Sequence, residues 1–224
     1  MKSILTLIAC AFFTCSFAQT AYTANDSLSY AMGQDLAQYI KKMELPINNK
    51  ILLQAFADVL EGKTTKFTDD QKDGILRDGM QRIQEEKDAA LKAKAQEFLD
   101  ANKKNAGVKS TPEGIQYLVL KEGTGAQATE TDSVVVHYIG SIADGTEFDN
   151  SYKRGEPIEI TLDNVIEGWK LAIPLMKVGS KYKFFIPYHL GYGERGSGPI
   201  PPYSTLIFEV ELIDIKKSTA DETA

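Results

Sequence analysis

The stretch VVVHYIGSIADGTEFDNS, residues 134–151, decides the fold of the second half of the chain. It opens on β-branched and aromatic residues, which favour a strand, and Asp144-Gly145 then marks a tight turn. Four further β-rich runs lie around it, separated by Gly, Asp and Pro: IQYLVL (115–120), PIEITL (157–162), KYKFFIP (181–187) and TLIFEVELIDI (205–215).

A short helix interrupts these strands. Asn164 with Glu167 three residues on resembles a capping box, and Pro174 should shorten the helix at its far end. On it Val165, Ile166, Trp169 and Ile173 share one face. We therefore expect an α+β arrangement, an antiparallel sheet curved around one short helix.

The first half of the chain is helical. From Asn25, with Asn25 to Ser27 as candidate caps, apolar residues recur at three- and four-residue steps until Pro46. A second amphipathic pattern follows Asn48 and stops near Gly62. Two such helices have too little apolar surface for a core of their own, so we expect the chain to pair with a second copy as a homodimer.

A third helix is predicted from about Asp69 to Lys104, since Thr68-Asp69-Asp70-Gln71 is a good capping sequence and no Pro follows until residue 112. At roughly 1.5 Å per residue it would be on the order of 50 Å long. Its second half, EEKDAALKAKAQEF (85–98), has little to bury and predicts a solvated rod. The alternative is a helix packed on the following domain.

The first eighteen residues, MKSILTLIACAFFTCSFA, have the pattern of a secretory signal peptide: one lysine, an uncharged apolar run and small residues before Gln19. This predicts export, most simply to the periplasm. Lipid attachment at Cys10 is the alternative, but the apolar run continues past that cysteine. Cys10 and Cys15 both lie in this segment, so the mature chain would carry no thiol for disulfides or catalysis.

Charge and motif content exclude several function classes. Beyond residue 18 the chain has 24 basic against 31 acidic side chains, which argues against a nucleic-acid partner. His137 and His189 have no cysteine partners and no tight spacing, so neither a metal nor any other cofactor is expected. GERGSG (193–198) lacks the Lys-Ser/Thr ending of a phosphate loop.

What remains between residues 134 and 208 is a set of aromatic and apolar residues without a nucleophile and its base. Such a site could serve a reaction that needs neither proton transfer nor a covalent intermediate, such as rotation about an X-Pro peptide bond. Taken singly, each of these residues is as easily explained as core.

The segments 134–151, VIEGWKLAIPLMKVGSKYKFFIP (165–187), GYGERGSGPIPP (191–202) and STLIFEVELIDI (204–215) resemble, in that order and spacing, an FKBP-type peptidyl-prolyl isomerase. SLSYAMGQDLAQYIKK (27–42) and residues 95–125 resemble the Mip-like branch of that family. In that branch the N-terminal region dimerises and a long helix holds each isomerase domain away from it.

The resemblance implies roles for particular residues. Asp149 would lie at the pocket rim, tied to a tyrosine hydroxyl or to a ligand donor, although an Asp before Asn150-Ser151 is also an ordinary turn residue. Tyr192 would donate its hydroxyl to the substrate carbonyl, and Ile200 its backbone N–H, from a glycine-rich flap that by itself is just a flexible loop. Trp169 would form the pocket floor, and the walls would be Tyr138, Phe148, Val165, Ile166 and Phe208.

The resemblance also implies partners. These are unfolded or X-Pro-containing polypeptides, a second copy of the chain and a macrolide inhibitor. Ile158 and Ile160 stand where the small family members often carry aromatic rings, so the resemblance leaves macrolide affinity open.

The predicted organisation is a signal peptide (1–18), a helical dimerisation domain (19–67), a linking helix (68–106), an isomerase domain (107–216) and a disordered tail (217–224). The predicted function is a prolyl isomerase that assists the folding of exported proteins. Two alternatives use the same chain differently: a periplasmic holdase chaperone in which isomerisation is secondary, and a surface protein anchored through Cys10.

Overall fold

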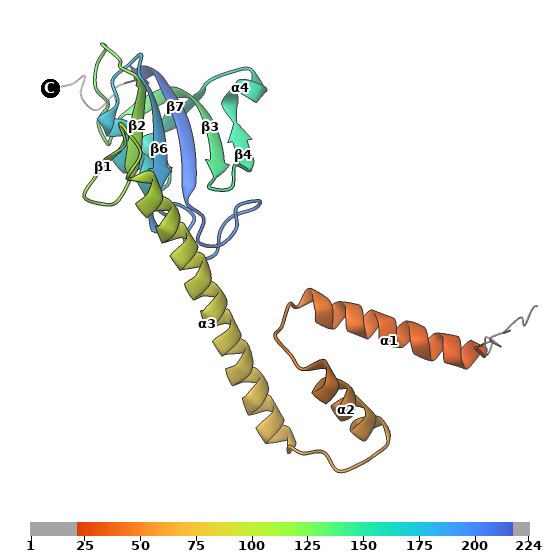
Figure 1. Cartoon of the computed structure of the whole chain (residues 1–224). Helices are drawn as coiled ribbons and strands as arrows, with labels where there is room; N and C mark the ends of the chain where they lie inside the picture. The colour runs from red at the N-terminus through yellow and green to blue at the C-terminus, as the bar shows by residue number, and fades with distance from the viewer. Residues whose placement is uncertain (1–21, 217–224) are drawn as a thin grey trace, which may run out of the picture. The chain divides into compact units, whose positions relative to one another are not determined.

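The computed structural model describes residues 22–216, so the predicted signal peptide, Cys10 and the predicted tail lie outside it. The chain divides into two compact units with the boundary between Asp70 and Gln71. Figure 1 shows the helices and strands of both. No helix within residues 22–216 is long and apolar enough to cross a bilayer.

The first unit holds the two predicted amphipathic helices, α1 (Ala24–Lys42) and α2 (Asn49–Leu60). The α1 cap is Thr23, not Asn25 to Ser27 as predicted, because the Thr23 hydroxyl accepts from the Asp26 N–H while the Asp26 carboxylate accepts from the Thr23 N–H. Asn48 caps α2 as its position predicts, accepting from the first backbone amides of the helix.

Helix α3 (Asp69–Asn102) has nearly the predicted bounds. The prediction of a solvated rod over residues 85–98 is wrong for one face, where Asp88, Lys92, Ala95 and Phe98 are half-buried, and beyond it the end of the helix is buried. Leu99 and Asn102 are buried, Asn102 Nδ2 donates to Gln116 Oε1 at 2.8 Å, and Gln116 Nε2 donates to the Leu99 carbonyl at 2.8 Å. A side-chain amide network thus joins the end of α3 to the sheet, where an apolar stripe was expected to be necessary.

The second unit contains one antiparallel sheet in the order β1-β2-β6-β7-β3-β4, with β5 paired to β3. The predicted α+β class is confirmed. The strands are β1 (Lys109–Ser110), β2 (Gln116–Lys121), β3 (Ser133–Ile142), β4 (Glu147–Asn150), β5 (Ile158–Thr161), β6 (Lys181–Ile186) and β7 (Leu206–Lys216).

Short helical turns connect the strands: α4 (Ser151–Arg154), η1 (Leu162–Asn164), α5 (Glu167–Ala172), η2 (Ile173–Leu175) and η3 (Tyr188–Leu190). Asn164 does not cap α5 as predicted. It ends η1, and α5 begins at Glu167 with Ile166 as the flanking residue. As Pro174 predicts, α5 stops at Ala172 and continues only as the 3₁₀ turn η2.

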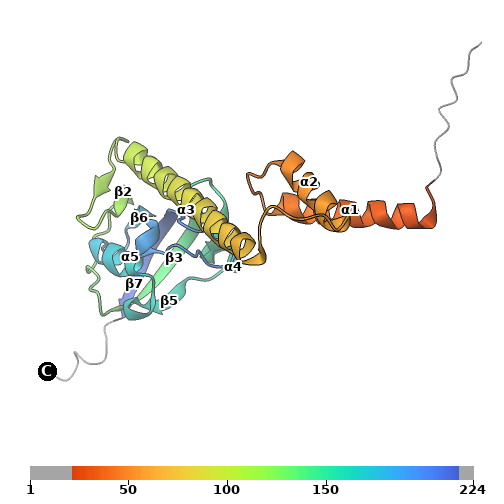
Figure 2. The same ribbon diagram turned by 90° about the horizontal axis from the view of Figure 1, so that it is seen from below.

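The core lies between α5 and one face of the sheet (Figure 2). Every second residue is buried along β3, and along β7 from Leu206 to Leu212, in keeping with the period of two that a half-buried strand requires. Gly168 of α5 lies so close to Ile186 of β6 that an added Cβ would overlap that side chain. The absence of a side chain at Gly168 therefore sets how closely α5 approaches the sheet.

Candidate active site

Four aromatic rings from β3, β4, α5 and β7 meet over the sheet, and we call them the aromatic cluster: Tyr138, Phe148, Trp169 and Phe208. The Trp169 ring centroid lies 5.2 Å from those of both Tyr138 and Phe208, with interplanar angles of 90° and 83°. Phe148 meets Phe208 edge-on at 5.6 Å. Edge-to-face contacts of this kind stabilise by about 0.5–1.5 kcal/mol each beyond the area they bury.

Strand register brings these rings together. Tyr138 pairs with Val210 and Gly140 with Phe208, so Tyr138 and Phe208 are diagonal neighbours on the inner face. A Cβ on Gly140 would lie 2.7 Å from the Phe148 ring and 3.0 Å from the Phe208 ring. Gly140 is therefore the gap into which both rings fit, and a larger residue there would separate them.

Asp149 lies at the edge of the cluster. Its carboxylate accepts from the Tyr138 hydroxyl through Oδ2 and from Arg154 Nη1 through Oδ1, and Arg154 Nη2 also donates to the Tyr138 hydroxyl oxygen at 3.2 Å. The resemblance implied a contact of Asp149 with a tyrosine or with a ligand, whereas the contact with Arg154 was not predicted. Arg154 reaches the Asp149 carboxylate because α4 makes a single turn after its Asn150 cap. The cap was the one feature of the sequence that could have indicated this turn.

These contacts shift the pKa values of Asp149 and Tyr138 in opposite directions. Burial acts to raise the pKa of Asp149, but the hydrogen bonds from Tyr138 and Arg154 outweigh it, so the net pKa lies below the ordinary value. Burial, and then the bond to Asp149, raise the pKa of the Tyr138 hydroxyl. At neutral pH the site therefore holds a carboxylate and a neutral phenol.

Ser151 anchors the backbone beneath the network. Its hydroxyl accepts from the Tyr138 N–H at 2.8 Å, donates to the Tyr138 carbonyl at 3.2 Å and lies 2.9 Å from His137 Nδ1. Ser151 is fully buried at the start of α4. Ser151 thus joins the strand that carries Tyr138 to the helix that carries Arg154. No sequence motif predicted this contact.

Val165 and Ile166 are half-buried against the core that contains Trp169, and their role as pocket walls remains a prediction. Within residues 22–216 the structure gives the Ile166 N–H no acceptor, because it precedes the first turn of α5. The roles predicted from the sequence did not include this backbone donor. Its signal is the position itself, one residue ahead of the helix.

Segment 191–203, which contains the predicted flap, is folded on itself. The Ser197 N–H donates to the Ile200 carbonyl and the Ile200 N–H to the Ser197 carbonyl, each at 2.9 Å. The Ile200 side chain belongs to the core, 6% exposed, while Tyr192 is 38% exposed. Among residues 22–216 no ring contact or hydrogen bond joins the Tyr192 side chain to the aromatic cluster, so its role remains a prediction.

A substitution at Gly196 tests whether activity depends on the conformation of segment 191–203. Its φ is +69° and an added Cβ would overlap the Ile200 carbonyl and lie 2.7 Å from the Pro201 carbonyl carbon. We expect Gly196→Ala to displace the turn and lower kcat/KM for an X-Pro peptide about ten-fold, equivalent to about 1.4 kcal/mol. Gly198→Ala is the matched control, since Gly198 has φ +54° with no atom within 4 Å of its Cβ. Equal activity in the two variants would show that the backbone clash is irrelevant.

No group of three or more His, Cys, Asp or Glu side chains that could hold a metal ion occurs in residues 22–216. The groups present at the cluster are aromatic faces and edges, one carboxylate held by Tyr138 and Arg154, and backbone donors. None of these is a nucleophile paired with a base. The arrangement suits a change of conformation better than bond cleavage.

Comparison with known proteins agrees with this chemistry. Residues 125–213 match the family model described as FKBP-type peptidyl-prolyl cis-trans isomerase. Residues 25–119 match the model for the domain amino terminal to such isomerases. The holdase alternative has no better support.

Similar proteins match over most of their length. The chain is 42% identical to the FKBP-type isomerase FkpA of Aeromonas hydrophila over 90% of this chain and 80% of that protein. It is 37% identical to the outer membrane protein MIP of Legionella longbeachae over 88% of each. The crystal structure of FkpA from Escherichia coli superposes with a TM-score of 0.66 at 35% identity, covering 87% of this chain and 98% of that one. The chain therefore belongs to the family of FKBP-type peptidyl-prolyl cis-trans isomerases and is an enzyme of this class.

Proposed function

We propose that the aromatic cluster receives the prolyl ring of the substrate and that Trp169 lies beneath it, as its floor. The observation that carries this proposal is the contact of Trp169 with the edges of Tyr138 and Phe208, beside a carboxylate already engaged by Tyr138 and Arg154. Phe148, Val165 and Ile166 then form the apolar walls.

The reaction requires only that the twisted imide be bound better than the planar one. The barrier to rotation is about 18–20 kcal/mol because amide resonance is lost on twisting. In the twisted state the carbonyl is less polar, so transfer from water into an aromatic site costs less than it does for the planar imide. A rate increase of about 10⁵ corresponds to roughly 7 kcal/mol of such differential binding.

Hydrogen-bond donors orient the substrate in this proposal. The Ile166 N–H is one candidate, since it has no acceptor within residues 22–216 and lies next to the wall residue Val165. The exposed Tyr192 hydroxyl is the second, directed to the substrate carbonyl. The Ile200 N–H could serve only by exchanging the Ser197 carbonyl for the ligand.

The decisive measurement is the cis-trans exchange rate of an X-Pro peptide, followed by NMR exchange spectroscopy with the purified chain from residue 19 onwards. We expect exchange to be accelerated by many orders of magnitude relative to buffer. Tyr192→Phe removes only the hydroxyl and should raise KM or lower kcat by about ten-fold if that hydroxyl donates to the substrate. An unchanged rate would assign substrate orientation to the backbone donors.

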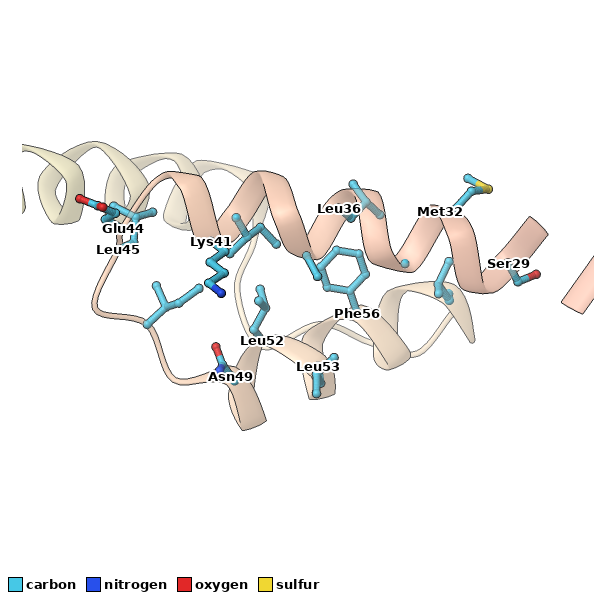
Figure 3. Close-up of a pocket in the computed structure, with 15 residues that line it drawn as sticks. Ser29, Met32, Leu36, Lys41, Glu44, Leu45, Asn49, Leu52, Leu53 and Phe56 are labelled. Carbon is cyan, nitrogen blue, oxygen red and sulfur yellow. The ribbon is translucent and has the colours of Figure 1, made fainter. Parts of the chain in front are cut away.

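We infer further that the chain forms a homodimer through its first unit. Apolar side chains of α1 and α2 line a hollow of about 990 Å³ (Figure 3). In the single chain Met32 is 60% exposed, Leu36 45% and Leu53 68%. Exposed apolar surface on two helices without a core is stabilised when a second copy covers it.

A pair of charge insertions tests the dimer. Phe56 lines the hollow, whereas Val59, 62% exposed on the same helix, does not. We expect Phe56→Glu to halve the molecular mass measured by light scattering and Val59→Glu to leave it unchanged. Both should retain activity on a short peptide, because neither residue belongs to the second unit. A dimeric Phe56→Glu variant would place the interface elsewhere.

We propose that the enzyme is exported and assists the folding of proteins in the periplasm. Two observations support this proposal: the signal-peptide pattern of residues 1–18, and the resemblance of the chain to the Mip-like branch. Mass spectrometry of the mature protein tests this directly. A mature N-terminus at Gln19 is expected, whereas a lipid-modified Cys10 would establish anchoring to a membrane instead.

A further inference from the structure

Lys92 of α3 contacts both ends of segment 191–203. Its Nζ lies 3.2 Å from Glu194 Oε1, near the start of the segment, and 5.0 Å from the centroid of the Tyr203 ring at its end. The bond to Glu194 is the largest cause of the raised pKa of Lys92. A single side chain of the linking helix therefore joins the two ends of the turn that carries Tyr192 and Ile200.

Tyr203 is held in an unusual conformation. Its φ is +58°, a left-handed value that bulky residues rarely adopt, and yet its side chain is 4% exposed. Its N–H donates to the Gly193 carbonyl at 3.1 Å, and its ring meets Tyr188 edge-on at 5.2 Å. Burial, and then the neighbouring Asp88 carboxylate of α3, raise the pKa of its hydroxyl. The surroundings, α3 included, therefore maintain this conformation.

One face of α3 is half-buried or buried along its last four turns. The residues of this face follow alternating three- and four-residue steps, and of the residues between them only Phe98 is also half-buried. Phe98 adds a ring contact to Phe185 of β6 at 6.2 Å. The residues of this face are Asp88, Lys92, Ala95, Leu99 and Asn102.

We propose that α3, through Lys92 with Tyr203 as its counterpart, positions segment 191–203 for substrate binding. Helix α3 then favours, before substrate arrives, the arrangement of the segment in which its two ends are held together. Lys92 and Tyr203 are positioning residues, since neither is assigned a contact with substrate. The inference rests on the proposed binding role of Tyr192.

Hydrogen exchange measures the arrangement of the segment without reference to catalysis. The amides of Gly193, Ser197, Ile200 and Tyr203 are each hydrogen-bonded within the segment or to Tyr188. Lys92→Met removes the ion pair and the cation–π contact, so we expect these amides in the full chain to exchange about three- to ten-fold faster. Lys87→Met is the control, because Lys87 is exposed on the same helix with no ion pair among residues 22–216.

The kinetic consequence separates positioning from general stability. A smaller fraction of binding-competent molecules lowers apparent affinity, so KM for an X-Pro peptide should rise about two- to five-fold in Lys92→Met with kcat unchanged. A variant that merely unfolded would instead lose kcat. Lys92→Arg retains the charge and should restore both readouts.

Exchange in Lys92→Met equal to that in Lys87→Met would overturn the proposal, and so would faster exchange with an unchanged KM. If the wild-type chain accelerated no X-Pro exchange at all, the proposed function would fail. The hydrogen-exchange comparison would still show whether α3 holds the segment.

Discussion

Replacing Trp169 by alanine is expected to reduce kcat/KM for an X-Pro peptide by about 30- to 150-fold, which corresponds to about 2–3 kcal/mol of lost transition-state binding. The indole is 5% exposed and lies 5.2 Å from both Tyr138 and Phe208, so its removal takes away the proposed floor and two edge contacts together. Steady-state assay of the full chain measures the effect.

The same substitution should lower the free energy of unfolding by about 3–5 kcal/mol, the usual cost of truncating a buried tryptophan. Activity must therefore be compared with a variant that loses stability elsewhere. Leu212→Ala truncates a fully buried residue four positions along β7 from Phe208, towards the far end of the strand. It should be destabilised by about 2–5 kcal/mol with kcat/KM near wild type while it remains folded.

Urea unfolding gives the folded fraction of each variant under assay conditions. If folded Trp169→Ala retained more than about a third of wild-type kcat/KM, a loss below about 0.7 kcal/mol, the indole would be a core residue and not the floor of the site. Trp169→Phe preserves an aromatic ring, so its kcat/KM should lie between those of the wild type and Trp169→Ala.

Replacing Asp149 by alanine is expected to lower kcat/KM by about 10- to 100-fold. The carboxylate is the shared acceptor of Tyr138 and Arg154, and hydrogen bonds to charged groups contribute about 1.5–3 kcal/mol. Without it the phenol and the guanidinium lose their common partner, and the rim of the aromatic cluster is free to rearrange. Glu147→Ala is the matched control on the same strand, since it removes an exposed carboxylate paired with Lys153 at 2.7 Å. It should change kcat/KM less than two-fold, the scale of an exposed ion pair at about 0.4 kcal/mol.

The pH dependence follows from the directions of the two pKa shifts. The pKa of Asp149 is lowered and that of Tyr138 is raised, so neither group changes protonation between about pH 5 and 9, and kcat/KM should be independent of pH there.

The stability of the fold should depend on pH in acid. A carboxylate whose pKa is lowered by folding stabilises the folded state above its unfolded pKa of about 3.9, and this stabilisation is lost as the pH falls through the folded-state pKa. The difference in unfolding free energy between wild type and Asp149→Ala should therefore be full at pH 7 and shrink below about pH 4. A bell-shaped activity profile centred near neutrality would indicate a titrating group that these contacts do not include.

Local patterns predicted the elements of this chain well. The β-rich runs around residues 134–142 and 205–215 became β3 and β7, and the capping residue Asn48 and the uninterrupted run after Asp69 correctly placed α2 and α3. Such signals are reliable because caps and periodic burial depend on residues within a few positions of each other. Errors occurred where two local signals competed. Thr23 forms a reciprocal box with Asp26, and Asn164 closes a separate 3₁₀ turn and does not cap α5.

The candidate site was only partly predictable. The resemblance named the aromatic residues, and the antiparallel register then placed Tyr138 beside Phe208 with Gly140 as the gap. Arg154 and Ser151 were missed because their partners are Tyr138 and Asp149, and a hydrogen bond between strand and helix has no sequence period. The packing of the end of α3, just beyond the predicted solvated rod, was missed for the same reason. Asn102 and Gln116 are polar, and their burial is favourable because they hydrogen-bond each other, the Leu99 carbonyl and Asn105.

By itself the sequence determined which segments are helix and which are strand, and it predicted an aromatic site that has no nucleophile paired with a base. Only the tertiary structure decided what supports that site. Asp149 is held by an arginine from the next turn of helix, and segment 191–203 is held by a lysine about a hundred residues earlier in the chain. The physical reason is that secondary structure follows from interactions between near neighbours, whereas the contact of Lys92 with Glu194 exists only once folding has brought residues far apart in the chain together.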